Sequence, residues 1–210
     1  MQARSAFIAG TDTGIGKTWI AQRLIRAMVA QGFRVAAMKP IAAGADLTAD
    51  GLRNEDALAL MQASNVEAPY ALVNPVCLPL ATSPHLAARA AGVRIDPQAV
   101  RVAYDALVHR ADVVVAEGAG GWLAPIGDGP DETMQDIAMA LGLPVVLVVG
   151  LRLGCISHAL LTQDAILRSG LEFSGWIANA GFAGADPDFD RDGEYLRALE
   201  ERLLAPQITL

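Results

Sequence analysis

The stretch Gly10-Thr11-Asp12-Thr13-Gly14-Ile15-Gly16-Lys17-Thr18 decides the fold of this chain. It follows a short apolar run at residues 6–9 and precedes an amphipathic stretch at residues 19–30. A strand, a glycine-rich turn and Gly-Lys-Thr at the start of a helix form a cradle for phosphate groups, because backbone N–H groups and the positive end of the helix point inward. Lys17 adds a full positive charge, and the Thr18 hydroxyl can ligate Mg²⁺. The stretch therefore predicts nucleotide binding.

The spacing of this stretch departs from the commonest phosphate-loop pattern. That pattern has four residues between the first glycine and the Gly-Lys pair, whereas five residues separate Gly10 from Gly16. A lysine in an ordinary turn is the alternative interpretation. The position between a predicted strand and a predicted helix favours the cradle.

Composition and charge indicate a folded chain with an acidic surface. The chain has 210 residues, of which 53% are hydrophobic and 19% charged, and no stretch resembles a linker. We therefore expect one domain over residues 1–210 with a buried sheet, and not a disordered chain. The net charge of −7 repels nucleic-acid phosphate and anionic lipid, so we expect neither as a partner.

The cysteines and the apolar runs of the sequence indicate in which cellular compartment the protein is expected. The chain has two cysteines at no metal-ligand spacing, and Met1 leads within a few residues into the first predicted strand. The longest apolar run, residues 144–151, is too short to span a bilayer. We expect a cytoplasmic protein in a reducing compartment.

Predicted strands alternate with predicted helices along the chain. Strands are expected at residues 5–10, 34–38, 76–78, 113–116, 145–149 and 176–178. Helices are expected at residues 17–31, 54–63, 83–90, 97–110, 134–141, 157–168 and 193–204. Strands that are apolar on both faces and joined by helices predict an α/β fold, with a parallel sheet flanked by helices on both faces. Ligands of such sheets bind beyond the carboxyl ends of the strands.

Lys39 directly follows the second predicted strand, at the edge of the sheet where Lys17 is expected. Two lysines close together repel each other unless both face an anion, which a phosphate chain supplies. The alternative is a solvated lysine at the end of a strand.

Two carboxylates are candidates for holding Mg²⁺ together with Thr18. Glu117 closes the apolar run 113–116 and precedes Gly118-Ala119-Gly120-Gly121, whose glycines allow a close approach of backbone to ligand. Asp56 lies near the start of a predicted helix. Mg²⁺ keeps several waters and takes few carboxylates, so Thr18, Asp56 and Glu117 would suffice. The alternatives are an exposed glutamate in a turn and an aspartate that balances a helix dipole.

Five segments together resemble the dethiobiotin synthetase family. They are GTDTGIGKT at 10–18, KPIA at 39–42, GLRNEDA at 51–57, EGAGGW at 117–122 and GCISHA at 154–159. The resemblance follows the family's order over nearly the whole chain, and the extra residue in the phosphate loop is itself the family's form.

The resemblance implies a fold, an activity and an assembly. Members of this family have a parallel sheet of the P-loop NTPase type and form homodimers. They close the ureido ring of the biotin precursor, converting diaminopelargonate, CO₂ and MgATP into dethiobiotin, ADP and phosphate. The resemblance therefore implies ATP and Mg²⁺ as cofactors and small molecules as substrates.

The resemblance also assigns roles to individual residues. It gives catalytic roles to Lys39, Lys17 and Thr13, and it places Mg²⁺ at Thr18, Asp56 and Glu117. The residues it places at the nucleotide are Gly14, Ile15, Gly16, Lys17, Thr18, Trp19, Asp56, Glu117, Gly118, Ala119, Gly120, Asn179 and Ala180. Asn179 matches an asparagine that reads adenine, and Gly118–Gly120 also line the diamine. The residues it places at the substrate are Ala43, Leu153, Gly154, Cys155, Ile156 and Ser157, of which the last five hold the substrate's carboxylate tail from the partner subunit.

The chain departs from the family pattern in two places. Ala43 stands where the family usually has a serine that contacts substrate, so we expect one hydrogen bond to be missing or replaced. The sequence stops at Leu210, where relatives usually continue past a Gly-x-x-Pro turn into a segment that helps to enclose the adenine. This second departure leaves base selectivity and nucleotide affinity open.

Two other interpretations remain at this stage. A switch ATPase of the partitioning or septum-positioning type shares the fold, but it usually carries an extra lysine where this chain has Thr11-Asp12-Thr13. The last predicted helix carries Glu194, Glu200 and Glu201, so it is not a basic membrane-binding tail. The second alternative is a degenerate paralogue that binds nucleotide without closing a ring.

Overall fold

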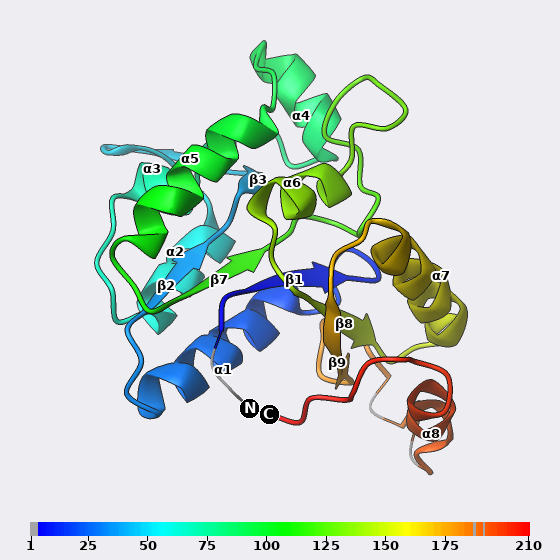
Figure 1. Ribbon diagram of the computed structural model, residues 1–210. Helices are drawn as coiled ribbons and strands as arrows, with labels where there is room; N and C mark the ends of the chain where they lie inside the picture. Colours follow the sequence, from blue (N-terminus) through cyan, green and yellow to red (C-terminus); the bar gives the residue numbers. More distant parts are fainter. Residues whose placement is uncertain (1–3, 187, 191) are drawn as a thin grey trace.

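A five-stranded parallel sheet forms the centre of the molecule. The computed structural model describes residues 4–186, 188–190 and 192–210. The strands of this sheet are β1 (Ala6–Gly10), β2 (Val35–Met38), β7 (Val113–Glu117), β8 (Val145–Gly150) and β9 (Phe173–Asn179). Their order is β2-β7-β1-β8-β9, and every neighbouring pair is parallel (Figure 1). The predicted parallel α/β sheet is confirmed.

Helices cover both faces of the sheet (Figure 1). Their bounds are α1 (Lys17–Ala30), α2 (Glu55–Ala63), α3 (Tyr70–Val73), α4 (Pro84–Ala91), α5 (Pro97–Val108), α6 (Met134–Leu141), α7 (Cys155–Arg168) and α8 (Glu194–Glu200). Most buried apolar residues of α1 and α2 belong to one apolar cluster, and most of those of α4 to α8 belong to another. The two clusters are separated by the sheet. None of the described helices has the length and apolar character that a membrane span requires.

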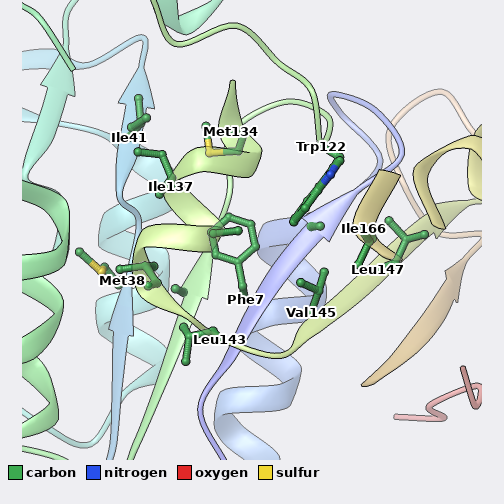
Figure 2. Packing of buried hydrophobic residues seen from close by; sticks show 14 of the residues in the cluster. Phe7, Met38, Ile41, Trp122, Met134, Ile137, Leu143, Val145, Leu147 and Ile166 are labelled. Carbon is green, nitrogen blue, oxygen red and sulfur yellow. The ribbon is translucent and has the colours of Figure 1, made fainter. Parts of the chain in front are cut away.

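Alternation along the strands explains why both faces of the sheet are buried. In β1, Phe7 packs in the cluster that contains α5, α6 and α7, whereas Ile8 packs in the cluster that contains α1 and α2. Figure 2 shows Phe7 among Met134 and Ile137 of α6, with Trp122 beside it. The Phe7 and Trp122 rings meet edge-on, with centroids 6.3 Å apart. Successive side chains of a strand point to opposite faces, so a strand buried on both sides reads as a continuous apolar run.

Short elements between β2 and α4 add two small sheets. Their strands are β3 (Ile41–Ala43), β4 (Asp46–Thr48), β5 (Gly51–Arg53) and β6 (Val76–Leu78). Strands β3 and β6 pair in parallel, and β4 and β5 form an antiparallel hairpin. Of these strands only β6 was expected. Strands of three residues leave too little periodicity to be recognised in a sequence.

Several boundaries differ from the sequence-based expectation. Helix α7 begins at Cys155, not at residue 157. Its N-cap is Gly154, which adopts the left-handed conformation (φ 93°). Helix α8 ends at Glu200, not at residue 204, and the Leu204 N–H then donates to the Gln163 side chain at 2.7 Å. Strand β9 begins three residues earlier than expected, at Phe173.

Candidate functional site

The predicted phosphate cradle lies between the carboxyl end of β1 and the start of α1. Gly14 (φ 73°) and Gly16 (φ 82°) both adopt the left-handed conformation that favours glycine. A Cβ atom on Gly16 would lie 2.3 Å from the side-chain nitrogen of Asn179 at the end of β9. That nitrogen donates to the Ile15 carbonyl at 2.8 Å, and the Asn179 side-chain oxygen accepts from the Gly181 N–H at 3.0 Å. The Asn179 side chain therefore holds the phosphate loop by bonding to the loop's backbone at Ile15. The adenine-reading role of Asn179 stays a prediction.

The side chain of Lys17 lies along the inside of the cradle. It is 6% exposed, and its Nζ donates to the Asp12 carbonyl at 2.6 Å. The Asp12 carboxylate pairs with Arg152 and accepts from the Thr13 N–H at 2.7 Å. Asp12 thus stabilises the turn through its backbone and side chain.

A charged cluster forms where β2, β7, α1 and α2 meet. Lys39 Nζ lies 2.6 Å from Glu117 Oε1 and 2.9 Å from Asp56 Oδ2. The Thr18 hydroxyl lies within hydrogen-bond distance of both carboxylates, 2.8 Å from Asp56 Oδ1 and 2.9 Å from Glu117 Oε1. The structure brings these four residues together, as the topology predicted. Their roles as metal ligands and catalyst stay predictions.

Burial and neighbouring charges shift the pKa values in this cluster. Burial and the nearby charge of Lys39 lower the pKa of Lys17 to about 8. Burial also disfavours the charged form of Lys39, but Glu117 and Asp56 outweigh it and raise the pKa of Lys39 above 10.5. For Asp56, burial is outweighed by Lys39, and its pKa falls below the ordinary value. The cluster therefore holds a permanent cation between two carboxylates, beside a second lysine that titrates much lower.

The donor set suits Mg²⁺. Among the described residues, Glu117 Oε2 is the one buried side-chain oxygen or nitrogen without a hydrogen-bond partner. A buried carboxylate oxygen without a partner is costly, and a cation beside it removes that cost. Within the described part of the chain, no group of three or more His, Cys, Asp or Glu side chains could hold a metal. Two carboxylates and a hydroxyl fit a Mg²⁺ ion that keeps several waters.

These groups lie along a cavity of about 920 Å³. The predicted site residues that line it are Thr13, Gly14, Gly16, Lys17, Thr18, Trp19, Lys39, Ala43, Asp56, Glu117, Ala119 and Gly120. The predicted residues that do not line it are Ile15, Gly118, Asn179, Ala180, Leu153, Gly154, Cys155, Ile156 and Ser157. The last five are the two residues before α7 and its first three residues; Leu153 is 80% exposed and Cys155 is buried. Within one chain this segment does not reach the cavity, and its role toward a partner subunit stays a prediction.

Sequence reasoning missed part of the cavity wall. The additional lining residues include Asn54, Ala81–Pro84 and Gly181–Ala183. Residues 81–84 follow β6, and residues 181–183 follow β9. Applying the strand-end rule to these two predicted strands would have found both segments.

Lys17 and Lys39 are the only two lysines in the 210-residue sequence. The other cationic side chains among its 16 Lys and Arg residues are arginines. Lysine-specific labelling therefore reports on the candidate site alone.

This property makes the pKa difference directly measurable. In protein labelled with ¹³C-lysine, we expect two side-chain resonances, with Lys17 titrating at about 8 and Lys39 above 10.5. Because Lys17 is charged only below its pKa, nucleotide affinity should fall as pH rises through about 8. The Lys17→Arg variant assigns the resonances. A Lys17 midpoint near the ordinary value would contradict this account of the cradle.

The fold and the cradle define the chain as a P-loop NTPase-type protein. A family model described as an AAA domain matches residues 4–202. Among solved structures, a chain of the MinC:MinD cell division protein complex of Aquifex aeolicus superimposes with a TM-score of 0.60 at 15% identity, covering 98% of this chain and 79% of that one. The 54 kDa signal recognition particle protein of Aeropyrum pernix gives a TM-score of 0.57 at 18% identity, covering 99% of this chain and 41% of that one. Identities this low show the fold alone.

Curated relatives are much more similar in sequence. The ATP-dependent dethiobiotin synthetase BioD of Aromatoleum aromaticum is 48% identical over 205 residues, which are 98% of this chain and 88% of the relative. The protein of the same name from Pseudomonas paraeruginosa is 49% identical over 201 residues, 95% of this chain and 86% of the relative. The chain therefore belongs to the ATP-dependent dethiobiotin synthetase family, and the family resemblance of the sequence is confirmed.

Proposed function

We propose that this chain is a Mg²⁺- and ATP-dependent dethiobiotin synthetase acting as one domain. It closes the ring of 7,8-diaminopelargonate with CO₂ through a carbamate and a carbamoyl-phosphate mixed anhydride. One observation supports this most strongly: the cavity of about 920 Å³ is lined by Lys17, Lys39, Thr18, Asp56 and Glu117 together with the glycines of the cradle. The matched chain of the MinC:MinD complex is only 15% identical and shares only the fold, so the switch ATPase is not favoured.

The reaction begins without help from a covalent enzyme group. An uncharged amine of the diamine attacks CO₂ and loses a proton, which gives a carbamate. A carbamate oxygen then attacks the γ-phosphorus of ATP in line, and ADP leaves. Charge spreads over the oxygens of the transferring phosphoryl group, and the ammonium groups of Lys17 and Lys39 stabilise it.

Ring closure follows within the same molecule. The second amine attacks the carbamoyl carbon, phosphate leaves, and the ureido ring forms. Because the two reacting groups are tethered, holding the diamine still supplies much of the rate, and effective molarities reach roughly 10⁵–10⁸ M in such cases. The cavity wall around Ala43 and Gly120 is the part of the chain that we assign to this positioning.

Mg²⁺ would be held by Thr18, Asp56 and Glu117. It supplies charge neutralisation on the nucleotide phosphates. Within this set, the buried Glu117 Oε2 is the atom that gains a partner.

We further propose that the protein works as a homodimer in which the start of α7 reaches the partner's site. Backbone N–H groups at a helix N-terminus suit the carboxylate tail of the diamine, and Leu153 is largely exposed. The Ser157→Asp variant should raise the KM for the diamine, because it puts a negative charge beside that tail while leaving a good helix start.

Mixed dimers test this assignment. Lys39→Ala and Ser157→Asp subunits, each impaired alone, should recover activity when mixed, because one site then receives a normal Lys39 and a normal α7 start. Mixed subunits that stay inactive would show that the segment acts within its own chain. A monomer in analytical ultracentrifugation would exclude the arrangement.

The whole proposal is tested by incubating the pure protein with diaminopelargonate, bicarbonate and MgATP. Mass spectrometry should show a product that has gained one carbon and one oxygen and lost two hydrogens, with one ADP and one phosphate per product. ATP binding without this product would identify the degenerate paralogue instead. Repeating the assay with CTP and GTP measures base selectivity.

A further inference from the structure

A chain of buried and partly buried hydrogen bonds joins the backbone of Lys39 to the start of helix α2. Asn74 donates from Nδ2 to the Lys39 carbonyl at 2.7 Å, and the Lys39 N–H donates to the Val73 carbonyl at 2.7 Å. The Tyr70 hydroxyl donates to Asn74 Oδ1 at 3.0 Å and accepts from the Asn54 N–H at 2.8 Å. Both backbone groups of Lys39 are thus held by the end of α3.

The other end of the chain of bonds fixes the helix that carries Asp56. Asn54 is the N-cap of α2, and its Oδ1 accepts from the Ala57 N–H at 3.3 Å. Its Nδ2 donates to the Gly44 carbonyl at 2.9 Å. Asp56 lies in the first turn of this helix, two residues beyond the cap. Its position therefore depends on Asn54.

We propose that Tyr70 and Asn74 are positioning residues that set the distance between Lys39 and the Mg²⁺ ligand Asp56. This inference rests on the proposed function and extends it to residues that do not touch substrate or nucleotide. Neither of the two lines the cavity.

The chemistry explains why such a link is needed. Lys39 now bonds to Asp56 and Glu117, but in the reaction its ammonium group acts on the phosphoryl group while the carboxylates hold the metal. Direct contact between the side chains cannot then keep the two elements in place. Sixteen residues containing the β4–β5 hairpin separate Lys39 from Asp56 along the chain, so the link must come from elsewhere.

Burial makes the link rigid. Asn74 is 2% exposed and Asn54 is 5% exposed, so each broken bond would leave an unpaired polar group away from water. Burial also raises the pKa of Tyr70 to about 12, so its hydroxyl keeps the proton that it donates to Asn74. The Arg53 guanidinium lies over the Tyr70 ring, 4.2 Å from its centroid, and holds the ring in place.

The Tyr70→Phe variant tests the proposal by removing one oxygen and keeping the ring. The measurement is ADP affinity by calorimetry with and without Mg²⁺, which requires no turnover. We expect Tyr70→Phe to reduce the enhancement of ADP affinity by Mg²⁺ about tenfold, with little change in the affinity for ADP alone. It should lower kcat by a similar factor and leave the KM for the diamine unchanged.

Two further variants keep the test sharp. Asn74→Ala breaks the same chain of bonds at its next link and also removes the bond to the Lys39 carbonyl. The double variant should therefore lose little more than Asn74→Ala alone, because the two residues act as one unit. Tyr195→Phe is the matched control on α8, at the opposite edge of the sheet (Figure 1), and should match the wild type.

Two outcomes would overturn the proposal: an unchanged Mg²⁺ enhancement in Tyr70→Phe, with or without a lower melting temperature, or fully additive losses in the double variant. Failure of the proposed function would look different. The wild type would then make no dethiobiotin, while the binding comparison would still decide whether the link positions Asp56.

Discussion

Replacing Lys39 with alanine is expected to lower turnover by roughly 10³–10⁵-fold, the range seen when a cation that stabilises phosphoryl transfer is removed. Lys39 is 4% exposed and points at the carboxylates, in line with a charge that acts inside a site shielded from water. Nucleotide should still bind, because the cradle and Lys17 remain. Steady-state kinetics and calorimetry with MgADP separate these two effects.

Two control variants distinguish the loss of this charge from a general loss of structure. Arg202→Ala removes a cation that is paired with Glu201 on the surface, and it should leave turnover unchanged. Lys39→Arg keeps the charge but replaces the compact ammonium group with a larger, planar guanidinium group. Its turnover should therefore lie between those of Lys39→Ala and the wild type. Near-normal turnover in Lys39→Ala would remove Lys39 from the catalytic group.

The Glu117→Gln variant is expected to raise the Mg²⁺ concentration needed for half-maximal activity by roughly 10–100-fold. Glu117 is 1% exposed, and its Oε2 has no partner among the described residues, so the negative charge of this carboxylate is available to a metal ion. The neutral amide has the same shape but lacks that charge. Activity should return at high Mg²⁺, since Thr18 and Asp56 remain.

The measurement is a magnesium titration of initial rates at saturating nucleotide. Glu172→Gln makes the same chemical change in an exposed ion pair with Arg4 and serves as the control. If Glu117→Gln titrated like the wild type, Glu117 would lose its place in the metal site.

Most of the candidate site could be predicted from the residues that follow the strands. In a parallel sheet the carboxyl ends of the strands share one edge, so Lys17, Lys39 and Glu117 could be placed together without coordinates. Asp56 does not directly follow a strand, so the rule placed it at this edge less directly, from its position in the helix after the second predicted strand. Helix starts with a proline, such as Asp96-Pro97, were equally readable.

The remaining features depend on tertiary contacts that leave no local pattern. Strands β3, β4 and β5 have three residues each, and α3 has four, which is too short for a periodic signal. The link from Tyr70 to Asn54 joins residues 16 apart, and Asn179 reaches Ile15 across 164 residues. Neither contact follows from spacing or composition. The bond from Lys39 to both carboxylates likewise required the structure.

A crystal structure of the protein with Mg²⁺ and a non-hydrolysable ATP analogue tests the central claim most directly. We expect the Nζ atoms of Lys17 and Lys39 within about 3 Å of oxygens on the terminal phosphoryl group, with Mg²⁺ bound at Thr18, Asp56 and Glu117. Lys39 still bonded to Asp56 and Glu117, with its ammonium group turned away from the phosphoryl oxygens, would contradict the account.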